Sequence, residues 1–156
     1  MLLCKRAINP CRGLWTLPAG FQECGESTSE GAARETYEEA NAVVSGRLSP
    51  YAHLDIPAIS QTYIFFRATL ASPDGHSPGT ESLETKLFDV DDIPFNQIAF
   101  SSVKIVLDCY LQDLKKGSYS YHHGTILKQP EVSADSPDFV LSNYTCLSTD
   151  HKLHKL

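Results

Sequence analysis

The segment from Gly20 to Ala42, GFQECGESTSEGAARETYEEANA, constrains the fold more than any other part of the chain. Ser27 is followed three residues later by Glu30, which is the capping-box pattern that opens a helix. Asn41 is suited to the left-handed turn that ends one. The segment therefore predicts a helix from about Thr28 to Ala40, and that helix has to carry several glutamates on neighbouring turns.

Three of those glutamates, Glu35, Glu38 and Glu39, repel one another on such a helix. Residues three and four apart share a helix face, and each like-charge pair costs a few tenths of a kcal/mol. A divalent cation reverses the sign, because Mg²⁺ and Mn²⁺ prefer carboxylate oxygens and Mg²⁺ shares its remaining positions with water and substrate phosphates. Arg34 can orient one carboxylate bidentately, and Glu26 can fold back toward the same place. A solvated helix face is the alternative for this stretch taken alone.

Composition narrows the class of protein. A chain of 156 residues has the length of about one domain, and 42% apolar residues suffice for a single core. No window approaches 18 apolar residues, and MLLCKRAINP lacks the features of a signal peptide, so no membrane span or targeting signal is expected. The net charge of −6 argues against general nucleic-acid or anionic-membrane binding. A phosphate-bearing substrate remains compatible if a cation mediates.

The cysteines and histidines show no ligand spacing. The five cysteines are widely spaced without a CxxC pair, which predicts reduced and mostly buried thiols in place of a zinc site or a disulfide framework. The six histidines include one adjacent pair, His122 and His123. Neighbouring residues of an extended chain point to opposite sides, so this pair is not expected to bind one metal ion.

Strand and helix signals alternate along the chain, which predicts an α/β or α+β fold with a mixed sheet. Strands are expected at the N-terminus in LLCKRA, in VVSGRLSPYAHLDI, and in ETKLFDVDDIP before an acidic turn. QTYIFFRATLA is the strongest strand and is expected at the sheet centre. FSSVKIVLDCYLQDLKKG is expected to form a second amphipathic helix. The tail from Ser118 onward is expected to be partly ordered and frayed near HKLHKL.

The wider spacing of the acidic segment identifies a family resemblance. It reads G-x5-E-x7-R-E-x-x-E-E, and six fixed matches arise by chance in about one window in ten million. The matching residues are Gly20, Glu26, Arg34, Glu35, Glu38 and Glu39. This segment resembles the Nudix box, G-x5-E-x7-R-E-U-x-E-E-x-G-U, with Thr36 in place of an aliphatic residue and Asn41 in place of glycine. The resemblance implies a Nudix fold with a mixed sheet sandwiched between helices, and Mg²⁺- or Mn²⁺-dependent hydrolysis of a nucleoside diphosphate linked to another group.

Further segments resemble plant plastid Nudix hydrolases that act on FAD and ADP-ribose. These segments are LLCKRAINPCRGLWTLPAGFQECGES, TESLETKLFDVDDIPFNQIAF and YSYHHGTI. The resemblance implies a Nudix domain over residues 1–126, with its first strand upstream of Met1, and a C-terminal extension over residues 127–156. It also implies a chloroplast location and a homodimer.

The same resemblance suggests roles for individual residues. Glu35, Glu38 and Glu39 would bind the metal with the backbone carbonyl at Gly20, and Glu26 and Arg34 would support them. The general base is either a glutamate of the box or a carboxylate on a later loop. The loop candidates are Glu81 and Glu84, for which a solvated carboxylate is the alternative. Glu39→Gln is expected to abolish hydrolysis with little change in melting temperature, as for an exposed carboxylate.

Substrate contacts are expected from arginines and aromatic residues near the N-terminus and in the third strand. Arg6, Arg12 and Arg67 could contact a phosphate or ribose, with solvated roles as the alternative. Trp15 and Phe21 could stack on an adenine or isoalloxazine ring, with core packing as the alternative. The leading function is cleavage of FAD to FMN and AMP, or of ADP-ribose to AMP and ribose phosphate. Alternatives are an NTP, coenzyme A or NADH pyrophosphatase, and a non-catalytic nucleotide sensor.

Overall fold

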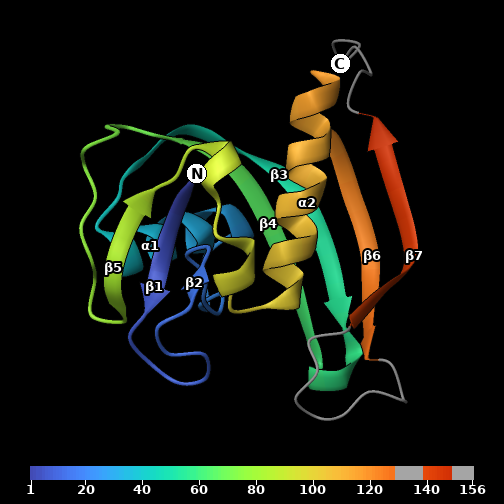
Figure 1. Ribbon diagram of the computed structural model, residues 1–156, viewed down its shortest axis with the longest axis horizontal. Coiled ribbons are helices and arrows are strands. Elements are labelled where there is room, and N and C mark those ends of the chain that lie inside the picture. Colours follow the sequence, from blue (N-terminus) through green and yellow to red (C-terminus); the bar gives the residue numbers. More distant parts are fainter. Residues whose placement is uncertain (129–138, 149–156) are drawn as a thin grey trace. The chain divides into compact units, whose positions relative to one another are not determined.

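The computed structural model describes residues 1–128 and 139–148 (Figure 1). The two helices found there are α1, Thr28–Ala40, and α2, Ser101–Lys116. The strands are β1, Leu2–Arg6; β2, Trp15–Thr16; β3, Val44–Ile56; β4, Gln61–Leu70; β5, Ser82–Leu87; β6, Ser120–Lys128; and β7, Phe139–Ser148. Three short 3₁₀ turns cover Pro57–Ile59, Val90–Asp92 and Phe95–Gln97. The predicted mixed class is therefore confirmed.

The strands form two sheets in the described part of the chain. The first has the order β2-β1-β5, in which β1 is antiparallel to both neighbours. The second has the order β4-β3-β6-β7, with β3 and β6 parallel and β6 and β7 antiparallel. The second sheet is thus the mixed one, and the strands divide between two sheets where the sequence suggested one.

The chain divides into two compact units. Unit 1 comprises Met1–Ser49 and Phe66–Lys104, and unit 2 comprises Pro50–Phe65 and Ile105–Leu156. β3, β4 and α2 each contribute residues to both units. All of the site residues predicted from the sequence lie in unit 1. The boundary predicted at residue 126 falls inside β6, within unit 2.

In unit 1, small apolar residues hold α1 against β1. Cys4, Ala40 and Ala42 are buried together, and Leu2 and Leu70 pack against them. The Cys4 thiol donates to the backbone carbonyl of Glu39 at the end of α1, with an S–O distance of 3.9 Å. Burial raises the pKa of the Cys4 thiol to about 12, so this cysteine is a neutral packing residue at physiological pH.

In unit 2, alternate residues of β3 face the core. Ala52, Leu54 and Ile56 are buried, whereas His53 and Asp55 between them are half-buried on the opposite face. Val106 of α2 and Ile126 of β6 complete the cluster with Tyr51. The prediction of mostly buried cysteines was wrong, because only Cys4 is buried, whereas Cys24 and Cys146 are exposed.

The predicted position of one strand was wrong. β4 is an edge of the described four-stranded sheet, because β3 uses its other side to pair with β6. Strong aromatic and β-branched character therefore did not mark a central strand here. The segment after Ser118, which was predicted to be partly ordered, contains two paired strands, β6 and β7. The fraying predicted near residues 151–156 lies outside the described residues. No described helix is long and apolar enough to cross a bilayer.

Candidate active site

Both predicted ends of α1 are confirmed by their hydrogen bonds. The backbone N–H of Glu30 donates to the Ser27 hydroxyl at 3.3 Å, and the backbone N–H of Ser27 donates to the Glu30 carboxylate at 2.8 Å. Asn41 adopts the left-handed conformation with φ 47°, and its N–H donates to the carbonyl of Tyr37 at 2.7 Å. Asparagine thus replaces the glycine of the box without losing the turn that ends the helix.

A loop that the sequence did not single out holds the same helix end. The Asn41 side-chain amide donates to the carbonyls of Ser77 and Pro78, each at 3.2 Å. The backbone N–H of Gly79 donates to the carbonyl of Glu39 at 2.9 Å. A Cβ at Gly79 would overlap the carbonyl of Glu38, so only glycine allows this approach. The loop is therefore fixed to α1 two residues before Glu81.

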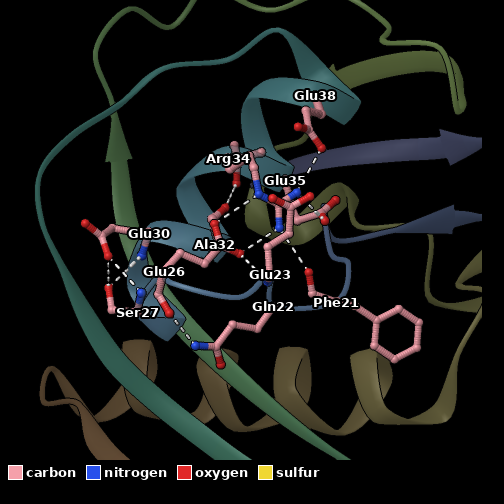
Figure 2. A network of polar contacts seen from close by, with 11 residues as sticks. Phe21, Gln22, Glu23, Glu26, Ser27, Glu30, Ala32, Arg34, Glu35 and Glu38 are labelled. Carbon is pink, nitrogen blue, oxygen red and sulfur yellow. Dashed lines mark hydrogen bonds and ion pairs between the residues drawn. The ribbon is translucent and has the colours of Figure 1, made fainter.

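Arg34 is the centre of the acidic cluster, as Figure 2 shows. It binds Glu26 through two hydrogen bonds, Nε to Oε2 at 3.1 Å and Nη2 to Oε1 at 2.8 Å. Its Nη1 donates to Glu35 Oε1 at 2.7 Å and to Glu38 Oε2 at 3.0 Å. Nη2 also donates to the carbonyl of Phe21 at 3.0 Å. One guanidinium thus bridges three glutamates and ties the preceding loop to the helix.

Glu26 is the carboxylate that Arg34 neutralises most completely. Hydrogen bonds from Arg34, together with the backbone N–H of Glu23 at 2.7 Å, lower the pKa of Glu26 to about 2. A Cβ at Gly31 would lie 2.7 Å from Glu26 Oε1, so the small residue on α1 makes room for this carboxylate. This geometry supports the structural role expected for Glu26 and Arg34.

Gly20 brings the loop backbone against the Glu35 carboxylate. A Cβ on Gly20 would overlap that carboxylate, so a larger residue would have to displace one of the two segments. This contact explains physically why the first position of the motif is a glycine. It also places the backbone of Gly20 beside Glu35, as the predicted ligand set requires.

Glu39 differs from its neighbours because it is buried. Only 8% of its surface is exposed, and its Oε2 accepts a hydrogen bond from the backbone N–H of Ala19 at 3.3 Å. Burial raises the pKa of Glu39 to about 7, with Glu35 and Glu81 adding to the rise and the Ala19 N–H and Arg6 opposing it. The expectation of an exposed carboxylate at this position was wrong.

The buried Glu39 carboxylate provides a test of whether a divalent cation fits here. Glu35 and Glu81 both disfavour its charge, and within the described residues no cation forms an ion pair with it, which is a costly arrangement for a protein interior. Oxygen donors of this kind suit Mg²⁺ or Mn²⁺. In the described part of the chain, however, Glu35, Glu38 and Glu39 do not bring three donor atoms within 4.8 Å of one another. The carboxylate oxygens fit a divalent cation in their chemistry. Arg34 binds Glu35 and Glu38, and it would compete with a cation for these two carboxylates.

The two loop carboxylates have different surroundings. Glu81 is exposed and contributes to the electrostatic environment of Glu39. Glu84 lies opposite Lys5 in the register of β5 and β1, and its Oε2 is 3.4 Å from Lys5 Nζ. Glu81 thus influences the pKa of Glu39 electrostatically, whereas Glu84 is paired with a lysine on the sheet.

The residues predicted to contact substrate also differ in their burial and in their contacts. Trp15 is 5% exposed and packs edge-on against Phe88 at 5.0 Å, so its ring has a core position. Phe21 is 76% exposed, and its ring points away from the cluster in Figure 2. Arg6 lies over the Phe100 ring at 5.0 Å and donates through Nε to the carbonyl of Pro10.

The other two arginines that were predicted to contact substrate are Arg12 and Arg67. Arg12 is exposed and donates to the carbonyl of Ala7. Arg67 is half-buried on β4. Among the three arginines predicted to contact substrate, Arg6 is the one that opposes the rise in the pKa of Glu39. It is therefore the substrate arginine with an electrostatic effect on the acidic cluster.

Comparison with known proteins agrees with this geometry. The sequence profile of the NUDIX domain matches residues 1–109 of the chain. The chain belongs to the NUDIX family. A NUDIX hydrolase from Nitrosomonas europaea of known structure is 51% identical, with a TM-score of 0.78 over 81% of this chain and 71% of that one.

Two other proteins are similar at lower sequence identity. An ADP-ribose pyrophosphatase from Methanocaldococcus jannaschii is 33% identical over 111 residues, which are 69% of this chain. The chain matches 64% of that relative's length. A MutT protein from Bacillus halodurans is 21% identical with a TM-score of 0.59, over 93% of this chain and 88% of that one, and indicates the fold alone.

Proposed function

We propose that this NUDIX protein hydrolyses the pyrophosphate bond of a nucleoside diphosphate linked to another group, with ADP-ribose or FAD as substrate. The observation that carries the proposal is the Glu39 carboxylate of the motif, which is buried and whose charge is further disfavoured by Glu35 and Glu81. Such an acidic centre has a stability cost that a purely structural helix would avoid. The 33% identical ADP-ribose pyrophosphatase supports ADP-ribose as the first substrate to test.

The residues divide the work in a way that their contacts suggest. Glu35, Glu38 and Glu39, with the backbone at Gly20, would hold Mg²⁺ or Mn²⁺. When bound, such a cation neutralises the diphosphate and lowers the pKa of a coordinated water. Arg34 restrains Glu35 and Glu38 and would have to release at least one of them for the ligand set to form.

The general base is assigned to Glu81 in preference to Glu84. Glu81 contributes to the environment of Glu39, whereas Glu84 is paired with Lys5. A positioned base contributes about 10²–10⁴-fold to a rate. We therefore expect Glu81→Gln to lower kcat by at least about 100-fold and Glu84→Gln to change it by less than about twofold. Equal losses in the two variants would remove this assignment.

Turnover of ADP-ribose and FAD, side by side in Mg²⁺ and in Mn²⁺, tests the proposed function. Chromatography should show AMP with ribose phosphate from the first substrate, or AMP with FMN from the second. Glu23→Gln is the matched control for substitutions of the motif glutamates, and it should keep the turnover of the unaltered chain. Glu23 is an exposed glutamate of the same segment, outside the fixed motif positions. A folded protein that leaves both substrates intact with both cations would overturn the proposal. A homodimer and a chloroplast location remain predictions.

A further inference from the structure

Unit 2 carries a second group of metal-ligand side chains, on β3 and β6. These parallel strands pair His53 with His123 and Asp55 with Thr125. Residues two apart on a strand share a face, so His53, Asp55 and His123 all lie on one face of the sheet. The buried residues Ala52 and Leu54 occupy the other face. The sheet register therefore places His53 next to His123, which follows it by 70 positions in the sequence.

The distances within this group suit a single cation. His53 Nε2 lies 3.2 Å from Asp55 Oδ1, and His123 Nε2 lies 3.8 Å from Asp55 Oδ2. One donor atom from each of the three residues lies within 4.8 Å of the others. Ligands about 2.0–2.1 Å from a tetrahedral zinc ion are about 3.4 Å apart, which falls between the two measured separations. The two imidazole rings are 5.0 Å apart between centroids, so they face a common region.

A hydroxyl from a neighbouring strand fixes the shared carboxylate. Thr62 of β4 donates to Asp55 Oδ1 at 2.7 Å. Hydrogen bonds of this kind orient metal-binding carboxylates in proteins and tune their affinity. Asp55, Thr62 and Thr125 also line an open hollow of about 330 Å³. Side chains that are one-third to two-fifths exposed leave the group accessible to an ion and to water.

We propose that His53, Asp55 and His123 form a binding site for a divalent transition-metal ion of the zinc class, separate from the glutamates of α1. Two imidazoles and one carboxylate favour Zn²⁺, Co²⁺ or Ni²⁺ over Mg²⁺, which prefers oxygen donors alone. Three protein ligands leave a fourth position open to water or to a small anionic ligand. The site shares no residue with the NUDIX motif, so it goes beyond the function proposed above.

Zinc titration of the full, reduced chain in excess Mg²⁺ tests the site, with Zn²⁺ as the probe. The Mg²⁺ occupies oxygen-only sites, so calorimetry should resolve a Zn²⁺-specific event. His53→Gln, Asp55→Asn and His123→Gln should each weaken that event by at least about 100-fold, since loss of a mere outer hydrogen bond already costs about 10–100-fold. His76→Gln is the matched control, because His76 is a half-buried loop histidine bonded to Thr85. It should leave the event unchanged.

A graded variant and a spectroscopic probe separate this site from other zinc ligands. Thr62→Val should weaken Zn²⁺ binding by about 10–100-fold without removing a ligand. Co²⁺ bound in place of Zn²⁺ should give visible d–d bands without thiolate charge transfer, and the bands should vanish in His123→Gln. Circular dichroism and melting curves establish that each variant is folded. Zinc affinity equal to that of the unaltered chain in the folded ligand variants, or thiolate bands that persist in them, would show that these residues make only surface hydrogen bonds.

Discussion

The acidic cluster of unit 1 and the group around Asp113 in unit 2 differ in the ratio of carboxylates to hydrogen-bond donors. The acidic cluster consists of Arg34 with Glu26, Glu35, Glu38 and Glu39. Around Arg34, one cation pairs with three glutamates. The buried Glu39 is disfavoured by Glu35 and Glu81 and has no ion pair among the residues that the structure describes. Asp113 is 1% exposed and is a single carboxylate with several donors. Its Oδ2 accepts from the Tyr51 hydroxyl at 3.1 Å and the Ser120 N–H at 2.9 Å, and lies 2.9 Å from His122 Nε2.

This difference indicates that the acidic cluster is arranged for binding, whereas the group around Asp113 is arranged for stability. Burial opposes the ionisation of Asp113, but its hydrogen bonds from Ser120, His122 and Tyr51 hold the pKa of Asp113 below its ordinary value. Burial of Glu39 has the opposite outcome, because that carboxylate has one weak donor in place of three. Three donors to Oδ2 stabilise the ionised Asp113, although its Oδ1 has no hydrogen-bond partner in the described part of the chain. Glu39 has only the one weak donor, which makes it a candidate for a ligand.

The largest expected effect comes from Glu39→Gln. Removing a charge that would bind the catalytic cation should lower kcat/KM by about 1000-fold, since such assistance is worth several kcal/mol. The metal-free variant should melt no lower than the unaltered protein at pH 8, because a disfavoured buried charge is removed. Substrate turnover and melting curves in EDTA measure the two quantities. Activity retained within about tenfold would place Glu39 outside the catalytic machinery.

Asp113→Ala should lower the stability of the protein and leave its hydrolytic activity nearly unchanged. It leaves the Tyr51 hydroxyl, the Ser120 N–H and His122 without their shared acceptor, which should cost about 3 kcal/mol of unfolding free energy. Hydrolysis per folded molecule should stay within about twofold, because Asp113 contributes nothing to the ligand set. Urea denaturation provides the measurement, with the exposed helix residue in Asp108→Ala as control. A loss below about 0.5 kcal/mol would abolish the contrast between the two centres.

Gly20→Ala tests the acidic cluster by shape instead of charge. The added methyl would overlap the Glu35 carboxylate and displace it from the loop. Because misplacement of a catalytic group by about 1 Å can cost about 100-fold, we expect a comparable loss in kcat/KM. Gly20 is exposed, so the melting temperature should change little. Gly75→Ala is the control in a loop far along the sequence, and equal activity of the two variants would show that the close approach of Gly20 is unimportant.

The sequence revealed the first of these regions more completely than the second. The acidic cluster lies in one continuous stretch, so helix periodicity and the caps at Ser27 and Asn41 were enough to predict α1 and its charged face. The burial of Glu39 was missed because it depends on the loops at Ala19 and Glu81, which approach only after folding. Only contacts that are local in sequence could be predicted in this way.

Unit 2 depends on sheet register, which hydrophobic patterning did not reveal. His122 and His123 do point to opposite faces, as expected for adjacent residues. The histidines show no ligand spacing along the sequence, whereas the structure places His123 opposite His53 in a parallel strand pair. His122 faces inward to Asp113. Parallel pairing brings distant residues together without any local signal, and the weak periodicity of β6 and β7 concealed the strands themselves.

The smallest expected effect is a pH dependence of metal-free stability that distinguishes the two centres. The native pKa of Glu39 is about 7 and its ordinary value is 4.5, so between these pH values the native state binds more protons than the unfolded state. The stabilising contribution of the protonated group is therefore fully present below pH 4.5 and is lost as the pH rises through 7. The shift sets an upper limit of about 3 kcal/mol, and partial hydration should reduce the change to about 1–2 kcal/mol.

Urea denaturation in EDTA from pH 4.5 to 8 isolates this change when Glu39→Gln is measured in parallel. Groups that do not interact with Glu39 contribute equally to both proteins and cancel in the difference. That difference should favour the variant increasingly as the pH rises, while Asp113→Ala should keep the pH slope that Glu39 produces. Parallel curves for the unaltered protein and Glu39→Gln would mean that the buried carboxylate is already satisfied without a cation, and the two centres would then be alike.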